Sequence, residues 1–356
     1  MKRRAFVTGA TGQTGSYLVE LLLAKGYEVA ILLRRSSSTT QQCWRIAQCL
    51  SQLTIIEGDV LDTSSLRQAL LFHPQEVYHL AAQSYVQRSF TEPLHTLDVT
   101  AGGTLRLLDA IRLYTSITDS VRFYQASSSE QYGNALTSPQ FEGTPMAPVS
   151  PYGCAKLLAH QVCHIYRESY GMFIACGIAF NHESPRRGEE FVTRRLTKGA
   201  AQVKLGIIQQ LPFYLPDPIP SRDWSHAKDI VEGIWLMLQH HLPRDFVLAS
   251  GQTHTVVEFA EQAFQQLGLR FQDCITIDER LRRPQELTTL VGDSRLAREV
   301  LGWYPQITFP QLVKEMVDAD LARETEALHH RAQSDTECHR PQTVAALTLS
   351  ADLHGL

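Results

Sequence analysis

Tyr152 and Lys156 are four residues apart, a spacing that places both side chains on one face of a helix. A tyrosine phenol with its ordinary pKa of about 10 is a poor base at neutral pH, but a neighbouring lysine ammonium favours the phenolate. Ser128 and Glu130, a short way upstream, add a hydroxyl and a carboxylate. Together these four side chains predict acid–base chemistry on one bound molecule.

A glycine-rich segment near the N-terminus predicts a nucleotide site. An apolar strand over residues 4–9 is followed by an amphipathic helix over 17–25 and a second strand over 28–33. In such a β-α-β unit, glycines let the backbone approach a pyrophosphate, and the free N–H groups of the helix N-terminus bind it. From this segment we expect cofactor contacts by Thr8, Gly9, Thr11, Gly12, Gln13, Thr14 and Gly15.

The second predicted strand ends in Arg34, Arg35 and Ser36. An NAD-binding protein carries an acidic residue there for the ribose hydroxyls, whereas arginines accommodate a 2′-phosphate. The pattern therefore predicts NADP as the cofactor. Asp59, just after the third strand, is placed to meet the adenine edge.

The pattern of elements predicts an α/β fold with a doubly wound parallel sheet. Further strands are expected at residues 53–57, 76–80 and 121–125, separated by helix-like segments. Ser128 and Glu130 come just after the strand 121–125. Ligands of open α/β sheets bind beyond the carboxyl ends of the strands, so this is where a site is expected.

The regular alternation weakens in the second half of the chain, which predicts a second, smaller α/β lobe that binds the substrate. We expect residues 1–180 and 223–255 to form the NADP-binding domain, and residues 181–222 and 256–325 to form the smaller lobe. Residues 326–356 are polar and lack sustained periodicity, which predicts a flexible tail.

Composition limits the class of protein. The chain has 356 residues, 44% of them hydrophobic, with a net charge of −4, as in soluble globular proteins that do not bind nucleic acid. No apolar run approaches a membrane span, and the cytoplasm is the expected compartment. Seven cysteines without a C-x-x-C pair predict reduced thiols and no metal site, and Cys154 is expected to pack on its helix.

With these motifs, the chain resembles the extended short-chain dehydrogenase/reductases and, among them, the GDP-mannose 4,6-dehydratase family. The two segments common to the superfamily are the glycine-rich one and residues 150–157 (SPYGCAKL). The segment FNHESPRRGEEFVTRR (180–195) contains residues 181–188 (NHESPRRG), which are far more specific. The resemblance runs from residue 5 to about residue 320, and its other segments are LLRRSSS (32–38), YQASSSEQYG (124–133), RDWSHAKD (222–229) and RRPQEL..LVGD (282–293).

The resemblance implies that Ser128, Glu130, Tyr152 and Lys156 form the active site of a redox-neutral dehydration. Tyr152 would take the proton of the sugar 4-hydroxyl while NADP+ accepts the C4 hydride. Glu130 would remove the proton at C5, and water would leave from C6 with help from Glu130 or Ser128. Return of the hydride to C6 gives a 4-keto-6-deoxy sugar. The family usually has threonine at the position of Ser128, so the hydroxyl is kept.

The resemblance also implies which residues contact the two ligands. Beyond the residues already named, those expected at the cofactor are Val60, Leu80, Ala81, Ala82, Ser84, Tyr152, Lys156, His182 and Arg187. Those expected at the GDP-sugar are Ser84, Ser128, Glu130, Asn181, Arg187, Val192, Arg195, Arg222, Arg283 and Glu286. Arginines bind a diphosphate with forked hydrogen bonds, and a glutamate accepts from a guanine edge or a ribose hydroxyl. His182 and His79 are equally compatible with a structural role.

Three other functions stay open. Gln83 and Gln131 differ from the family pattern, as a GDP-heptose 4,6-dehydratase with a bulkier C6 substituent would allow. A GDP-4-keto-6-deoxymannose reductase shares the fold and the Tyr/Lys pair, but it has no need of Glu130. A nucleotide-sensing regulatory protein typically lacks the tyrosine or the lysine, and both are present here.

The resemblance also predicts a homodimer or a homotetramer. In the superfamily, helices corresponding to residues 96–114 and 152–170 form a four-helix bundle between two subunits. Leu158 and Ile165 would belong to this interface or to the core of one subunit. The segment between Arg35 and the third strand is shorter than usual, which favours the dimer over the tetramer.

Overall fold

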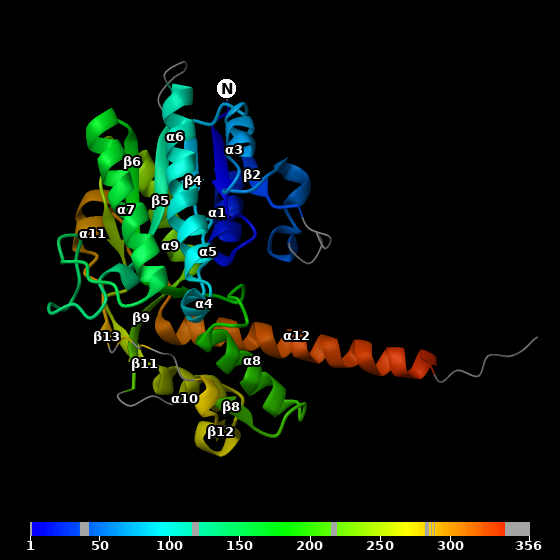
Figure 1. Ribbon diagram of the computed structural model, residues 1–356. Coiled ribbons are helices and arrows are strands. Elements are labelled where there is room, and N and C mark those ends of the chain that lie inside the picture. The colour runs from blue at the N-terminus through cyan, green and yellow to red at the C-terminus, as the bar shows by residue number, and fades with distance from the viewer. Residues whose placement is uncertain are drawn as a thin grey trace, which may run out of the picture.

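A computed structural model describes residues 2–35, 43–115, 121–214, 219–281, 285, 287 and 289–338. Its larger part is a seven-stranded sheet of order β10-β6-β5-β4-β1-β2-β3 in which all neighbouring strands are parallel (Figure 1). The strands are β1 (Arg4–Thr8), β2 (Glu28–Leu33), β3 (Thr54–Glu57), β4 (Glu76–His79), β5 (Arg122–Ser128), β6 (Phe173–Ala179) and β10 (Phe246–Leu248). This confirms the predicted doubly wound sheet.

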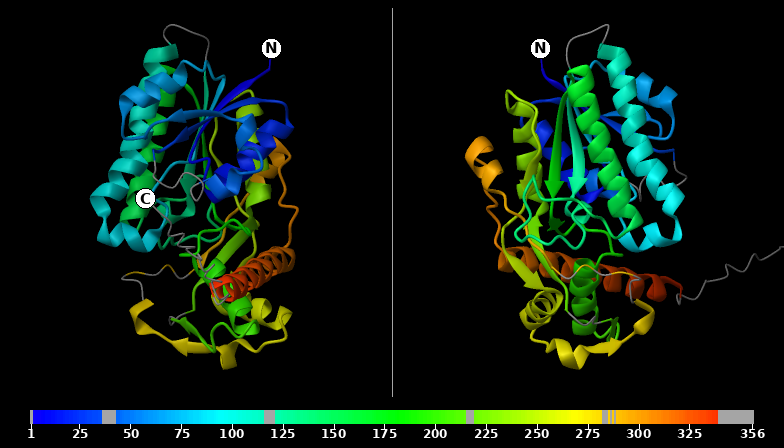
Figure 2. Two further views of the ribbon diagram at one scale, coloured as in Figure 1. Left: turned by 90° about the vertical axis from the view of Figure 1, so that its right-hand side faces the viewer. Right: turned by 60° about the vertical axis from the view of Figure 1, so that its left-hand side comes forward.

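Helices cover both faces of the main sheet (Figure 2), which explains why consecutive residues of β1 and β2 are buried and mostly apolar. On one face lie α1 (Gln13–Ala24), α9 (Ala227–Gln239) and α11 (Arg295–Leu301). The other face is covered by α3 (Thr63–Leu70), α6 (Gly103–Thr115) and α7 (Pro151–Tyr170). Short segments complete this part, namely α4 (Val86–Thr91), α5 (Pro93–Leu97), a π-helical turn (Asp98–Gly102) and 3-10 turns at Trp44–Ile46, Leu50–Gln52 and Ser129–Gln131.

The second lobe lies beyond the carboxyl ends of the main strands (Figure 1). Its larger sheet contains β7 (Asn181–Glu183), β9 (Ser221–His226), β11 (Thr253–Thr255) and β13 (Thr289–Leu290), and β8 (Leu211–Phe213) pairs with β12 (Ile275–Ile277). Its helices are α8 (Val192–Lys204), α10 (Val256–Gln266) and α12 (Phe309–Cys338), with 3-10 turns at Phe271–Cys274 and Glu279–Leu281. Leu196, Phe259 and Met316 belong to its separate apolar core.

Two expected boundaries differ from the structure. Strand β9 pairs with β7, β11 and β13, so residues 223–226, expected in the NADP-binding domain, lie in the sheet of the second lobe. Residues 326–338, expected in a flexible tail, continue α12 to Cys338. The chain has no glycine or proline between Pro310 and Pro341, so nothing interrupts the helix. The end of α12 projects past the body (Figure 1), and none of residues 326–331 has a buried side chain that would produce a periodic apolar pattern.

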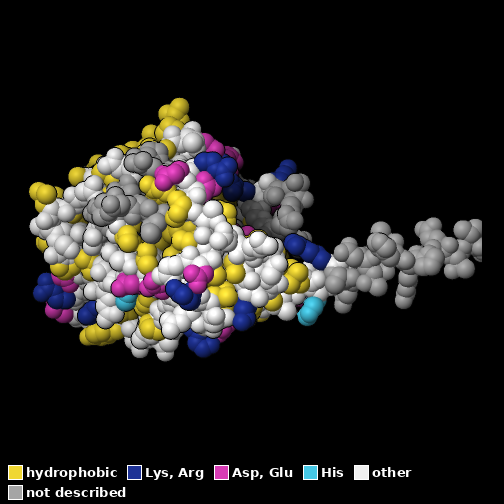
Figure 3. Space-filling model, turned by 90° about the horizontal axis from the view of Figure 1, so that it is seen from below, with side chains coloured by type: hydrophobic (Ala, Val, Ile, Leu, Met, Phe, Trp, Pro, Cys, Tyr) yellow, Lys and Arg dark blue, Asp and Glu magenta, His cyan; other side chains and the backbone are white. Residues whose placement is uncertain are grey.

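The described surface carries charges of both signs. Seen from below, acidic and basic side chains are interspersed over the second lobe (Figure 3). Among the helices that the structure describes, none combines the length and apolarity needed to cross a membrane. The six cysteines with described side chains are free thiols, and Cys154 is exposed rather than packed.

Candidate active site

A cavity of about 500 Å³ lies between the carboxyl edge of the main sheet and the second lobe. The main sheet contributes the turn between β1 and α1 and the ends of β5 and β6. The second lobe contributes residues of β7, β9 and the start of α8. All four side chains first singled out in the sequence line it: Ser128, Glu130, Tyr152 and Lys156.

The first turn of α7 carries Tyr152 to the end of β5. Ser150 begins the helix, because its Oγ accepts a hydrogen bond from the Gly153 N–H at 3.0 Å, and Pro151 occupies the first helical position. A Cβ atom on Gly153 would lie 2.7 Å from the carbonyl oxygen of Glu130. Only glycine therefore lets α7 approach the 3-10 turn that carries Glu130 this closely.

The charges around Tyr152 differ from the expectation that Lys156 alone favours its phenolate. Burial raises the pKa of Tyr152 to about 12; a hydrogen bond with Ser128 and the charge of Arg187 oppose this rise, and the charge of Glu130 adds to it. The Lys156 ammonium lies 5.9 Å from the centre of the Tyr152 ring and donates to the Ala126 carbonyl at 2.7 Å. In this arrangement Ser128 and Arg187 favour the phenolate, while the hydrogen bond of the Lys156 ammonium goes to β5. Burial lowers the pKa of Lys156 to about 8.

Ser128 and Glu130 are placed by the end of β5. The Ser128 Oγ accepts a hydrogen bond from the Glu130 N–H at 3.3 Å and so begins the 3-10 turn Ser129–Gln131. Glu130 is half-buried and lines the cavity beside Tyr152. A hydroxyl, a carboxylate and a phenol thus meet at one place, where they can move protons at neighbouring atoms of one ligand.

The glycine-rich turn forms a cradle at the same cavity. A Cβ on Gly15 would come within 2.2 Å of the Gly9 carbonyl oxygen, so the turn requires glycine there. The N-terminus of α1 has no side-chain cap, which leaves its N–H groups for an anion. This geometry fits the pyrophosphate of a dinucleotide. The predicted residues of this segment that line the cavity are Gly9, Gly12, Gln13, Thr14 and Gly15.

Thr8 and Thr11 are not among the described lining residues. The Thr8 hydroxyl bonds with His79 Nδ1 at 2.7 Å inside the sheet, and the Thr11 carbonyl accepts from Arg45 at 3.2 Å. Of the other predicted cofactor contacts, Leu80, Ala82 and Ser84 line the cavity. Val60 belongs to the core of the main domain, and Ala81 packs against it.

A second, open cavity of about 930 Å³ lies at the ends of β2 and β3. Arg34, Arg35 and Asp59 line it, as expected for the residues assigned to the far end of the cofactor. The Arg35 guanidinium forms an ion pair with Glu57 at 2.9 Å, while an Asp59 Oδ1 accepts from the Leu61 N–H at 3.0 Å. Ser36 lies outside the described residues.

The second lobe contributes four arginines to the lining of the cavity: Arg187, Arg195, Arg222 and Arg280. The Arg187 Nε lies 3.1 Å from a Glu183 carboxylate oxygen, and the Arg187 guanidinium stacks 3.5 Å from the centre of the Phe191 ring. A diphosphate is the kind of group that such arginines bind. The predicted sugar-nucleotide contacts that line the cavity are Ser84, Asn181, Arg187, Val192, Arg195 and Arg222, whereas Arg283 and Glu286 lie outside the described residues.

His182 links the second lobe to the glycine-rich turn. Its Nδ1 donates to the Phe180 carbonyl at 2.9 Å, so its Nε2 accepts from the Thr14 hydroxyl at 2.8 Å. Burial and the charge of Arg187 lower the pKa of His182 to about 4, which keeps the ring neutral near pH 7. The ring lines the cavity and also joins two parts of the fold.

The cavity contains residues that the sequence did not single out as ligand contacts. Glu190 and Phe191 lie within the segment 180–195 that carries the family resemblance, so that segment already contained a signal for them. Tyr214 and Arg280 come from irregular stretches of the second lobe, where no motif marks them. The lining residues missed in this way include Tyr85, Gln87, Glu190, Phe191, Tyr214 and Arg280.

Comparison with known proteins shows the family of the chain. The model of the family described as GDP-mannose 4,6 dehydratase matches residues 6–316. GDP-mannose 4,6 dehydratase 2 of Arabidopsis thaliana is 48% identical over 330 residues, covering 90% of this chain and 87% of that protein. The human GDP-mannose 4,6 dehydratase is 43% identical over 341 residues, which cover 89% of this chain and 91% of the human protein.

A solved structure shares the architecture. RMD from Pseudomonas aeruginosa, complexed with NADPH, superposes with a TM-score of 0.75 and 26% identity, over 90% of this chain and 100% of that one. The fold, the clustered Ser-Glu-Tyr-Lys set and a family match over most of the length lead to one conclusion. The chain belongs to the GDP-mannose 4,6-dehydratase family.

Proposed function

We propose that this protein converts GDP-mannose into GDP-4-keto-6-deoxymannose and water with bound NADP. The observation that carries the proposal is the meeting of Glu130, Tyr152 and Ser128 in the cavity that also contains the glycine cradle. When bound, NADP supplies the oxidising power needed at C4 of the sugar and the reducing power needed at C6. The reaction then needs no external reductant.

The chain's own residues move the protons. Tyr152 accepts the proton of the 4-hydroxyl, and its Ser128 hydrogen bond and the nearby Arg187 charge favour the phenolate that does so. A ketone at C4 acidifies the C5 hydrogen, which Glu130 removes as a proton. Glu130 then donates this proton to the departing 6-hydroxyl, which leaves as water. When C6 is reduced, C5 takes up one proton, which balances the proton that Tyr152 received from the 4-hydroxyl. A reductase has no step that uses such a carboxylate.

The positions that suggested a GDP-heptose lie away from the ligand space. Gln83 Nε2 donates to the Tyr85 carbonyl and to the Thr96 hydroxyl, both at 3.1 Å. Gln131 is fully buried, with its Nε2 3.7 Å from the sulfur of Met146. Neither glutamine is among the described residues that line the cavity. This supports GDP-mannose rather than GDP-heptose as the substrate.

The substrate assignment is tested by incubating the purified protein separately with GDP-mannose and with a GDP-heptose, without reductant. Mass spectrometry of the sugar nucleotide should show loss of one water from GDP-mannose at a much higher rate. A higher rate with the heptose would reverse the assignment. Tight NADP binding without turnover of either sugar would favour the sensor function.

Arg34 is proposed to select NADP through the 2′-phosphate. Arg34→Glu should weaken NADP binding about 100-fold and NAD binding less than about threefold, because a charge-assisted phosphate contact becomes a repulsion. Isothermal titration of cofactor-free protein measures both constants. Arg4→Glu is the matched control. It makes the same charge change at the start of β1, whereas Arg34 follows the end of the neighbouring strand β2, so it should leave the affinities for NAD and NADP unchanged. If Arg34→Glu weakened the binding of NAD and of NADP equally, Arg34 would not read the 2′-phosphate.

The homodimer stays a prediction, with a candidate surface. Large apolar side chains are exposed along α5, α6 and α7, including Leu158 at 47% and Ile165 at 57% exposure. α6 and α7 lie side by side on one outer face of the molecule (Figures 1 and 2). A second copy of this chain, pairing the same two helices, would cover this apolar face.

A further inference from the structure

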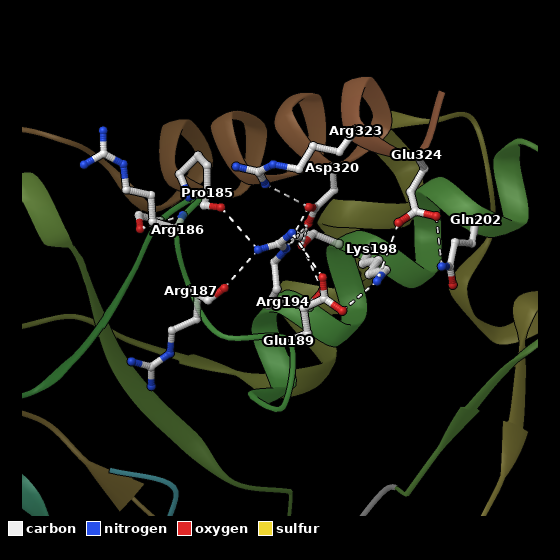
Figure 4. A network of polar contacts seen from close by, with 12 residues as sticks. Pro185, Arg186, Arg187, Glu189, Arg194, Lys198, Gln202, Asp320, Arg323 and Glu324 are labelled. Atoms are coloured by element: carbon white, nitrogen blue, oxygen red, sulfur yellow. Dashed lines mark hydrogen bonds and ion pairs between the residues drawn. The ribbon is translucent and has the colours of Figure 1, made fainter. Parts of the chain in front are cut away.

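The buried guanidinium of Arg194 connects three parts of the second lobe (Figure 4). Arg194 lies in α8 and its side chain is only 4% exposed; its Nε lies 2.7 Å from a carboxylate oxygen of Asp320, which is 1% exposed. Its Nη1 also donates to the carbonyl oxygens of Pro185 at 3.2 Å and Arg187 at 2.9 Å. Asp320 belongs to α12, so a helix far along the chain is joined to the loop before α8.

That loop reaches the cavity from the other side. Its Ser184 hydroxyl donates to Gln13 Oε1 at 2.8 Å, and Gln13 Nε2 donates to the His182 carbonyl at 2.8 Å. The side chain of Arg187, at the end of the loop, lines the cavity. The loop is therefore held between the glycine-rich turn and the Arg194–Asp320 pair. These contacts place the backbone that carries Arg187, whose side chain is then held by Glu183 and Phe191.

The chemistry of the pair favours a positioning role over simple stabilisation. A buried ion pair contributes little net stability compared with an apolar pair of similar volume, because both charges must be desolvated. A planar guanidinium can donate hydrogen bonds to a carboxylate and to two carbonyl groups at fixed angles, which a lysine ammonium cannot do. Arg194 donates in this way to Asp320 and to two carbonyl groups of the loop that carries Arg187.

We propose that Arg194 and Asp320 are positioning residues of the active site, which hold residues 185–187 so that Arg187 faces the nucleotide sugar. The proposal rests on the function proposed above, in which Arg187 favours the Tyr152 phenolate, and on the expected contact of Arg187 with the nucleotide sugar. Neither Arg194 nor Asp320 lines the cavity among the described residues, so their effect is carried through the loop.

Arg194→Lys is the most informative variant. It keeps the charge opposite Asp320 but loses the two carbonyl contacts. Trypsin cleaves after arginine, so cutting after Arg186 or Arg187 reports release of the loop. We expect cleavage there to become about tenfold faster, and the Kd for GDP, measured by titration, to rise about tenfold. In turnover, KM for GDP-mannose should rise by the same factor, with kcat changed less than about threefold.

Glu324→Gln is the matched control. Glu324 also lies on α12, one turn beyond Asp320, and its carboxylate accepts from Gln202 of α8 at 3.0 Å and lies 3.6 Å from Lys198 of α8. The Glu324→Gln variant should lower the melting temperature as Arg194→Lys does, while leaving the rate of loop cleavage and the affinity for GDP unchanged. If both variants alter cleavage and affinity equally, or if Arg194→Lys alters neither, the positioning role is excluded.

A double variant separates stability from positioning. Arg194→Lys with Asp320→Glu restores the combined length of the ion pair without restoring the carbonyl contacts. Its melting temperature should recover while loop cleavage stays fast; recovery of both would overturn the proposal. Protease resistance and GDP binding can be measured without turnover. If the wild-type protein had no dehydratase activity, the proposed function would be refuted. The cleavage and GDP-binding measurements would still decide whether Arg194 and Asp320 hold the loop.

Discussion

Replacing Glu130 with glutamine should abolish formation of the 4-keto-6-deoxy product while NADP and GDP-mannose still bind. Glutamine has nearly the same shape, but its amide cannot take a proton from C5 or give one to the leaving hydroxyl. Loss of general acid–base catalysis of this kind costs about 10²–10⁴-fold, and Glu130 serves two proton transfers, so we expect at least about 10³-fold. Product is measured by mass spectrometry and both affinities by titration.

The Glu130 variant should also stop at a defined stage. Oxidation at C4 does not require Glu130, so reduced nicotinamide should accumulate in one rapid phase, visible by absorbance. Glu190→Gln is the matched control, because Glu190 is another carboxylate that lines the same cavity. This variant should turn over at close to the wild-type rate, because Glu190 has no proton to transfer in the mechanism. Dehydration by Glu130→Gln at a near-normal rate would remove Glu130 from the mechanism.

Tyr152→Phe should block the reaction one stage earlier. The ring and its packing are kept, but no group remains to take the proton of the 4-hydroxyl. We expect at least about 10³-fold loss of product and no rapid phase of reduced nicotinamide, with both affinities within about threefold. The experiment is a stopped-flow mixing of enzyme and GDP-mannose followed by product analysis.

Tyr85→Phe is the control for Tyr152. It removes a hydroxyl from another tyrosine that lines the cavity, and its ring would keep the edge-on contact with Phe191 at 5.7 Å. The rapid phase should persist in this variant. Retention of a rapid phase in Tyr152→Phe would assign the first proton transfer to a different group. Together, the two active-site variants separate C4 oxidation from water loss.

Local motifs made the main domain and the core of the site predictable. The glycine segment determines a turn and a helix start through steric limits that act within a few residues. The i, i+4 spacing of Tyr152 and Lys156 likewise depends only on helix geometry. The position of Ser128 and Glu130 at a strand end followed from the general location of ligand sites in open α/β sheets.

Features that depend on distant contacts were not predictable. The direction of the Lys156 ammonium is a choice of rotamer, decided by the Ala126 carbonyl on another element. Arg194 and Asp320 are far apart in sequence, and nothing local marks them as partners. Residues 326–331 of α12 have no buried side chain, so their helical state gives no apolar periodicity and must be predicted from intrinsic propensity, which is a weaker signal.

The most direct test of the account uses GDP-mannose carrying deuterium at C4, incubated with the purified protein and no added reductant. Mass spectrometry and NMR would follow the sugar nucleotide. The account predicts a product lighter by one water, with a ketone at C4 and the deuterium in the new C6 methyl group. A product whose C6 carries no deuterium, or a substrate that remains unchanged, would contradict the proposed internal hydride transfer.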